Sequence, residues 1–515
     1  MKAENVTDFD QKFRTIFGGK SRVEGDAEDE PKSTVVEKTL EILAPFIRER
    51  WHTPSREAML TMRRPDGIDL HMALSSSETT EYLAYLHYQA TKKPISEATQ
   101  KAVVGLLSAQ ARYEGQEHPV YSRIAHVDGK IYVDMGDDLH CATCIDPALL
   151  PTGWKVIGSG DVPVRFRRSR SALPLPAPVS GVSLDGLRVI FPNIEDADWI
   201  QVVGWLVGCF QEYGGRAFLE LLGGQGTGKS TLGRYLISLV DPNDVPMRSM
   251  PKNEQDLLIS VLWRSVAGLD NLSVILAEMA DAFCRISTGA GISNRTLFKD
   301  AEETLLKAQL PLLWTAIEPQ AVRRADLQDR TITVRLESLG DDAVRGEREI
   351  AEAFEDIRPD LLGALYTAVA VALSRVDTMT IDRLPRLDDF ATWVEASAPA
   401  FGWDEGAFID VLESSRTEAS AMAIEASPIG PLIVAFMKDR THWNGTSSKL
   451  LSDLRTLADE DTRRSRSFPK DASRLSGQLR RMVQPLKAVG IRVEFDRSGR
   501  SRGCLLYTSP SPRDS

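Results

Sequence analysis

Residues 219–236, LELLGGQGTGKSTLGRYL, have the types and spacing needed to bind nucleotide phosphates. Gly223, Gly228, Lys229 and Ser230 match the P-loop pattern G-x-x-x-x-G-K-[ST], whose glycines let backbone N–H groups curl around the β-phosphate. In this pattern the lysine reaches the β- and γ-phosphates, and the hydroxyl binds Mg²⁺. We therefore expect ATP and Mg²⁺ as cofactors, held by the loop and the turn after it: Gly223, Gly224, Gln225, Gly226, Thr227, Gly228, Lys229, Ser230 and Thr231.

An acidic residue at the end of a neighbouring strand must help to hold the magnesium ion. The stretch RSVAGLDNLS (264–273) supplies Asp270 after an apolar strand, so Ser230 and Asp270 are the expected metal-binding pair. Asn271 stands where a second acid usually polarises the attacking water. Glu278 and Asp281, on the next predicted helix, are candidate substitutes.

Two later segments add candidate catalytic groups. AQLPLLWTAIEP (308–319) predicts a buried strand that ends in Thr315, placed to sense the γ-phosphate. AVRRADLQDRTITVRL (321–336) presents arginines before a strand, where a guanidinium can reach a neighbouring subunit's nucleotide. Each arginine alone is more typical of a solvated surface residue than of a catalytic one. The expected catalytic set is Lys229, Asp270, Thr315, Arg330 and Arg324.

Between these segments, CRISTGAGISNRTLFKDAEE (284–303) predicts a glycine-turned hairpin. Arg295, Phe298 and Lys299 lie at its far end. Cations beside an aromatic ring suit single-stranded DNA, because they attract phosphate and offer a face on which bases stack. The alternative is a plain surface hairpin.

The order of these segments resembles AAA+-type superfamily 3 helicases, above all the phage and mobile-element ATPases related to poxvirus-type helicase–primases. The motifs that carry the resemblance are DNLS (270–273), TG-G----R-L--D (288–300) and DL-DR (326–330). The resemblance implies a ring, specifically a hexamer, that translocates on DNA. Thr315-Ala316 replaces the usual Asn-Gly and Ala325 replaces a Pro, so we expect slower hydrolysis rather than none.

The elements that must position these residues divide the 515-residue chain into several parts. Residues 1–37 are polar and predicted to be disordered. Residues 38–171 are expected to form an α+β domain of unknown role, helical to about residue 115 and then stranded, with a hairpin that turns at Asp128-Gly129. A proline-rich linker (172–181), an α/β P-loop NTPase core (182–339) and a helical region (340–439) follow.

Residues 440–503 are expected to form a winged-helix-like DNA-binding module. From 462 to 503 there are 12 Lys and Arg against 3 Asp and Glu, in a chain whose net charge is −11. A helix, a basic helix and a strand pair follow one another, and the alternative is a charged solvated face. The expected duplex contacts are Arg474, Arg480, Arg481 and Lys487 on the helix, and Arg497 and Arg500 on the wing. Residues 504–515 resemble translated sequencing-adapter bases, so we expect a non-native tail outside the fold.

The amino-acid composition indicates which broad class of protein this is. The chain is 42% hydrophobic and 26% charged, which is typical of soluble globular proteins. Its longest apolar runs are shorter than a membrane span, and the charged N-terminus predicts no secretory signal. Five cysteines favour a reducing cytoplasm over a disulfide framework. Cys141 and Cys144, after His140, form only half of a zinc-site pattern.

Three functions fit these residues. The first is an ATP-dependent DNA helicase or replication-initiation ATPase of a phage or mobile element, which works as a homo-oligomeric ring. The second is an ATP-binding DNA-recognition switch with weak hydrolysis, which Asn271 favours. The third is a small-molecule kinase, for which the basic C-terminal module would have no use. No D-x-D cluster is evident in residues 1–190, so we assign no priming activity.

Overall fold

The structure, a computed structural model, describes residues 34–64, 66–181, 183–290, 292–295, 303–306, 308–319, 324–340, 345–381, 387–465, 467–496 and 503–508. These residues divide into two compact units, one built from residues up to 62 and 72–116, the other from 63–71 and 117–515. The expected boundary at residue 171 is therefore wrong, because the strands after residue 116 pack with the second unit.

The first unit contains α2 (Val35–Leu43), α3 (Ser77–Thr91) and α4 (Glu97–Tyr113) beside β1 (Ile47–His52) and β2 (Ala58–Arg63). β3 (Asp69–Ala73) and β4 (Gln116–Glu117) lie at its borders and complete a sheet in the order β3-β2-β1-β4. The prediction that this region is helical throughout is wrong for β1 to β3. Pro45 cannot continue a helix, and the buried Trp51 indole donates across the strand pair to Thr61 Oγ1 (3.0 Å).

The second unit begins with an antiparallel sheet in the order β5-β6-β7-β8 (Ile124–Val127, Lys130–Asp134, Ala142–Ile145 and Trp154–Ile157). The predicted hairpin is confirmed, since β5 and β6 pair around Asp128 and Gly129, both of which have positive φ. A buried ion pair joins this sheet to the residue that follows α7 (Lys229–Val240), with Arg123 Nε and Asp241 Oδ1 3.1 Å apart.

The proline-rich segment 172–181 is packed rather than a free linker. Leu175 is buried, and its N–H donates to Met135 O (2.7 Å). Val179 lies so close to Gly363 that a Cβ there would be 1.8 Å from Val179 O. The backbone of this segment therefore fits against a helix that lacks a side chain at the crossing point.

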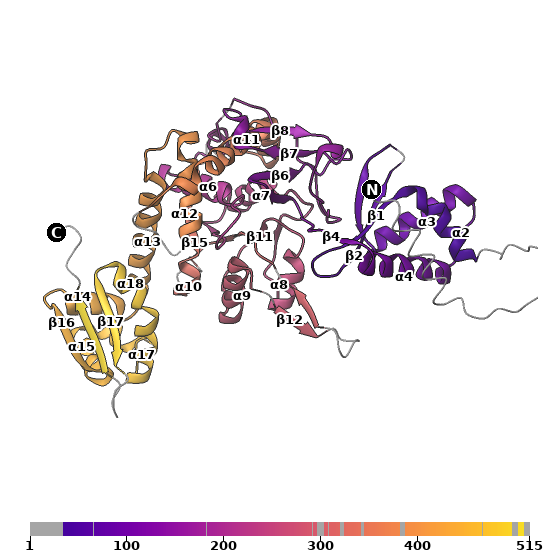
Figure 1. Cartoon of the computed structure of the whole chain (residues 1–515). Helices are drawn as coiled ribbons and strands as arrows, with labels where there is room; N and C mark the ends of the chain where they lie inside the picture. Colours follow the sequence, from indigo (N-terminus) through magenta and orange to yellow (C-terminus); the bar gives the residue numbers. More distant parts are fainter. Residues whose placement is uncertain are drawn as a thin grey trace, which may run out of the picture. The chain divides into compact units, whose positions relative to one another are not determined.

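The centre of the second unit is a parallel sheet in the order β10-β11-β14-β9-β15. Figure 1 labels two of its strands, β11 and β15. Its strands are β9 (Phe218–Leu222), β10 (Met247–Arg248), β11 (Ala267–Leu269), β14 (Leu312–Ala316) and β15 (Thr331–Arg335). Its helices are α5 (Gly186–Ile190), α6 (Asp196–Gly208), α7 (Lys229–Val240), α8 (Glu254–Val261), α9 (Ala277–Thr288) and α10 (Ala325–Gln328). β12 (Ile292–Arg295) and β13 (Glu303–Leu306) pair as a separate antiparallel hairpin, which confirms the predicted hairpin. The predicted glycine turn is wrong at Gly289, which ends α9 before the hairpin begins.

The predicted helical region is also present, as α11 (Glu347–Arg375), α12 (Asp388–Ser397), α13 (Ala407–Glu425) and α14 (Gly430–Met437). Among the described residues, α11 is long and apolar enough to cross a membrane, and α13 with α14 would pass the same test as one bent span. Leu361, Leu362 and Leu365 of α11 are fully buried in the main core, which is typical of a core helix in a globular protein. Short 3₁₀ turns lie at Ala44–Phe46, Pro147–Leu149, Ser159–Asp161, Val376–Thr378 and Ala398–Phe401.

The C-terminal module combines α15 (Ser447–Leu457), α16 (Glu460–Arg464), α17 (Ala472–Arg481) and α18 (Val483–Ala488) with an antiparallel sheet in the order β16-β18-β17. β16 is His442–Thr446, β17 is Ile491–Asp496 and β18 is Gly503–Thr508. The expectation that the fold excludes residues from 504 onwards is wrong for 504–508, because β18 is the middle strand and buries Cys504 and Leu506. In CLLYT (504–508), the alternate residues Cys504 and Leu506 are apolar, which suits a strand with one face in the core.

Candidate active site

The glycine-rich loop connects β9 to α7, as predicted. Gly226 and Gly228 have φ of 77° and 84°, a left-handed conformation that favours glycine. The Lys229 amine lies within the loop and donates to Gly223 O at 2.7 Å and to Gly224 O. Burial lowers the pKa of Lys229, and the charge of Asp270 partly offsets this shift. The loop thus places backbone amides and one ammonium group at the N-terminus of a 12-residue helix.

Asp270 and Thr315 lie together beside this loop because their strands are parallel neighbours. Leu269 is paired with Trp314, so the residues that follow each of them meet at the carboxyl edge of the sheet. Asp270 Oδ1 accepts hydrogen bonds from Ser230 Oγ (2.6 Å) and Thr315 Oγ1 (2.7 Å). The predicted residues from three separate segments therefore form one hydrogen-bonded cluster.

Thr315 also fixes the backbone after Asp270. Its Oγ1 accepts a hydrogen bond from Asn271 N (2.7 Å), and its carbonyl oxygen accepts one from Leu272 N (2.8 Å). Asn271 has φ of 53°, a left-handed conformation that asparagine adopts more readily than most residues and that these two hydrogen bonds stabilise. Thr315, which is 1% exposed, is the residue that provides this support.

The oxygens of Ser230 and Asp270 fit a magnesium ion. Mg²⁺ prefers hard oxygen ligands at about 2.0–2.1 Å, and a hydroxyl and a carboxylate oxygen 2.6 Å apart can bind one such cation together. Elsewhere in the described part of the chain, no group of three or more His, Cys, Asp or Glu side chains is placed to hold a metal.

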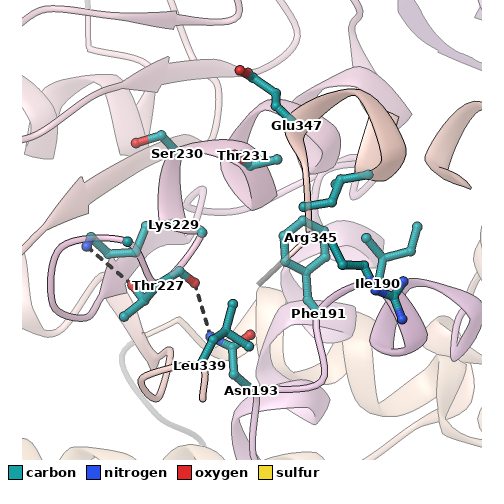
Figure 2. Close-up of a pocket in the computed structure, with 13 residues that line it drawn as sticks. Ile190, Phe191, Asn193, Thr227, Lys229, Ser230, Thr231, Leu339, Arg345 and Glu347 are labelled. Carbon is teal, nitrogen blue, oxygen red and sulfur yellow. Dashed lines mark hydrogen bonds between the residues drawn. The ribbon is translucent and has the colours of Figure 1, made fainter. Parts of the chain in front are cut away.

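A cavity of about 380 Å³ opens beside the loop. Figure 2 shows Phe191, Ile190 and Arg345 next to one another, with Thr227, Lys229 and Ser230 to their left. Leu339 and Ile350 complete the apolar lining. The cavity therefore joins an apolar surface to the glycine-rich loop, an arrangement that suits the base and ribose of a nucleotide.

Asn193 ties this cavity to the loop. Its Nδ2 donates to Thr227 O (3.0 Å) and to Glu337 O (2.7 Å), and Glu337 N donates to Asn193 O (3.0 Å). The far wall is fixed in a similar way, because Arg234 of α7 forms an ion pair with Glu347 (2.9 Å) at the start of α11. Segments before β9 and after β15 thus enclose the loop.

Arg330 lies at the opposite edge of the sheet from the loop. Its carbonyl accepts a hydrogen bond from Phe218 N (2.8 Å), and its Nη1 donates to Asp326 O (2.6 Å). Phe218 is the first residue of β9, and Leu222, which precedes the loop, is the last. At about 3.3 Å per residue, the strand separates these ends by about 13 Å. Arg330 is therefore positioned away from the Lys229 of its own chain.

Arg324 is held by acidic neighbours. Its Nη2 is 2.6 Å from Asp281 Oδ1, and its Nε is 3.7 Å from Asp326 Oδ1. Asp281, one of the two candidate substitutes for the missing second acid, is thus engaged by an arginine. Glu278, in the first turn of α9, is exposed.

The expected DNA contacts have mixed outcomes. Arg474, Arg480, Arg481 and Lys487 lie exposed on α17 and α18, and the Arg480 guanidinium lies over the Phe495 ring (5.1 Å). Of the hairpin residues, Arg295 is the last residue of β12, and only its backbone is described. The remaining four expected contacts lie outside the described residues: Phe298, Lys299, Arg497 and Arg500.

Sequence reasoning missed the residues that line the cavity, above all Phe191, Asn193 and Arg345. The first two lie about 30 residues before the loop and Arg345 lies more than 100 residues after it, with no motif to link them. The tripeptide FPN (191–193), with a proline and an asparagine typical of turns, was the available signal.

Comparison with known families gives two matches. Residues 188–405 match the family of the actinomycete integrative conjugative element replication protein, and residues 429–513 match the C-terminal domain of RepA from such elements. A search of curated proteins found no match.

Solved structures give distant fold similarities. One, titled "SCCmec type IV Cch - active helicase", is 13% identical with a TM-score of 0.47, over 90% of this chain and 92% of that one. Another, the A form apo structure of the NrS-1 C-terminal region, is 11% identical with a TM-score of 0.37, over 93% and 100%. Similarities of this size carry no argument about activity.

Proposed function

We propose that the chain is a RepA-type replication protein of an integrative conjugative element and acts as an ATP-driven DNA helicase or replication-initiation ATPase, which its two family matches support. In this proposal its core is a P-loop ATPase of the AAA+ superfamily 3 type. The observation that carries the proposal is the cluster of Lys229, Ser230, Asp270 and Thr315 at one edge of the parallel sheet.

Each residue of the cluster has a definite task in this proposal. The loop amides and Lys229 bind the β- and γ-phosphates, and the cavity lined by Phe191 and Ile350 takes the base. Ser230 and Asp270 hold Mg²⁺, which supplies charge neutralisation between the phosphates. Thr315 keeps Asp270 oriented beside the γ-phosphate, because its hydroxyl donates to Asp270 Oδ1. A Thr in place of a longer amide favours slow turnover.

The position of Arg330 supports a ring. Since about 13 Å of β9 separates its strand position from the loop, Arg330 serves the nucleotide of a neighbouring subunit in this proposal. Arg324 is the alternative donor, and it must first leave Asp281. A hexamer that translocates on single-stranded DNA is the assembly we infer.

Duplex DNA is assigned to the C-terminal module, which we propose is winged-helix-like. The order of the elements supports this assignment: the helices α15, α17 and α18 precede the strands β17 and β18. β16 belongs to the same sheet. The four exposed basic residues of α17 and α18 would contact phosphates or base edges: Arg474, Arg480, Arg481 and Lys487.

A second function is favoured by one observation. Asn271 replaces the second acid, and Asp281 is engaged by Arg324, so the described site offers little to polarise a water. An ATP-binding DNA-recognition switch with weak hydrolysis would have this site. Turnover in the presence and absence of DNA separates the two functions.

The test measures steady-state ATP hydrolysis with and without single-stranded DNA. We expect DNA-stimulated turnover in the wild-type chain and no turnover in Lys229→Ala, because no other described side chain neutralises the phosphates at that point. Arg348→Ala, an exposed substitution on α11 that removes one charge, is the matched control and should leave turnover unchanged. Wild-type turnover in Lys229→Ala would refute the assignment of the loop.

A further inference from the structure

A basic surface lies at the β10 edge of the parallel sheet, far along the chain from the expected DNA contacts. The segment VRFRRSR (164–170) contains four arginines and no acid. Arg168 is neutralised by the buried Asp134 (2.6 Å). Arg167 lies over the indole ring of Trp263, with its guanidinium carbon 4.0 Å from the ring centroid. The stack holds a cation flat against an aromatic side chain.

Two further arginines extend this surface. Arg264, next to Trp263, donates to Ser171 Oγ at a long distance of 3.4 Å. Burial lowers the pKa of Arg264, and the nearby charge of Arg248 lowers it further. Arg248 is the last residue of β10, and its buried Nε has no hydrogen-bond partner among the described residues.

Asp241, an acidic residue near Arg264, does not neutralise the charges of both Arg248 and Arg264. Asp241 attracts Arg264, but its Oδ1 accepts from Arg123 Nε (3.1 Å) and its Oδ2 accepts from Ser265 N (2.9 Å). Asp244 is exposed, and its N–H donates to Ser171 O (3.0 Å). Arg248 and Arg264 therefore repel each other, and an anion bound between them would relieve the repulsion.

We propose that Arg167, Trp263, Arg264 and Arg248, which we call the arginine strip, bind the phosphate backbone of single-stranded DNA. Guanidinium groups match phosphate geometry, and an aromatic ring among cations is the combination that single strands use. The choice of DNA as the polyanion rests on the proposed function. Arg248 also links the strip to the active site, because its carbonyl oxygen accepts a hydrogen bond from Asp270 N (2.7 Å).

The test measures binding of fluorescein-labelled oligothymidylate by anisotropy over a range of salt, with Arg248→Gln and Arg264→Gln proteins. Each lost phosphate contact should reduce the log–log salt slope by about 0.7, equivalent to about fivefold weaker binding at 0.1 M salt. Because each substitution removes a repulsion, the thermal unfolding midpoint should not fall. Arg348→Gln, an exposed arginine paired with Glu352, is the matched control for the loss of one charge.

Weaker binding, a smaller slope and an unchanged or higher midpoint would support the strip. Affinity and slope equal to those of Arg348→Gln would overturn it, as would a lowered midpoint or loss of self-assembly, since the arginines would then stabilise the fold or a subunit contact. Loss of duplex binding alone would overturn the single-strand assignment. DNA binding is measured without nucleotide, so the result does not depend on ATP hydrolysis. Failure of the arginine-strip proposal is therefore distinguishable from failure of the ATPase proposal, which Lys229→Ala tests.

Discussion

Replacing Thr315 with Val tests the cluster at the sheet edge most directly. Valine has nearly the same volume as threonine, so the substitution removes the hydroxyl without leaving a cavity. That hydroxyl donates to Asp270 Oδ1 and accepts from Asn271 N, each at 2.7 Å. Thr315 is 1% exposed, so water cannot replace either bond.

The structure sets the size of the effect. A hydrogen bond to a charged group contributes about 1.5–3 kcal/mol, and an unpaired buried N–H costs about 1–3 kcal/mol. These contributions share one side chain and are not additive, so the free energy of unfolding should fall by about 2–4 kcal/mol. Asp270 also loses one of its two side-chain donors, and Asn271 loses the bond that holds its positive φ. Hydrolysis should therefore fall at least about tenfold, while ATP binding should change little.

The assay combines urea unfolding with ATP turnover at varied Mg²⁺. Thr315→Ser keeps the hydroxyl and should retain most turnover. Thr333→Val is the matched control, since the Thr333 hydroxyl donates to the buried Glu220 carboxylate (3.3 Å) in the same sheet but outside the cluster. If Thr315→Val unfolds and hydrolyses ATP as the wild type does, the hydroxyl does not position Asp270.

Two further outcomes are expected. Arg330→Ala and Lys229→Ala should each be inactive alone, yet their mixture should regain activity at interfaces that pair an intact Lys229 with an intact Arg330. A mixture that co-assembles but stays inactive would refute the role in trans. Arg474→Ala combined with Arg480→Ala should reduce the salt slope for duplex DNA by about 1.8, and an unchanged slope would place the duplex contact elsewhere.

The candidate site could be predicted where its signal is local. The glycine loop follows from covalent spacing, and Asp270 and Thr315 each end a short apolar strand, so parallel pairing brings them together. The cavity could not be predicted in this way. Phe191 and Arg345 meet only because α5 and the start of α11 pack around the loop, and tertiary packing leaves no periodic pattern in the sequence.

The fold was predicted least well where local patterns compete. Residues 47–73 contain apolar spacings compatible with a helix, but Pro45 and the pairing of β1 with β2 produce strands. Residues 504–508 were excluded by their resemblance to a non-native peptide, although their alternation suits a sheet interior. In both cases the outcome depends on a partner strand that the local sequence does not identify.

The separation of Arg330 from the glycine loop has a consequence for the cell. In the proposed ring, one chain holds only half of the groups that hydrolysis needs, so a lone chain is an incomplete enzyme. Specific activity should therefore rise steeply with protein concentration and disappear on dilution, even at saturating ATP. Replication of the element would then begin only after enough copies of the protein had accumulated, with assembly itself acting as the threshold.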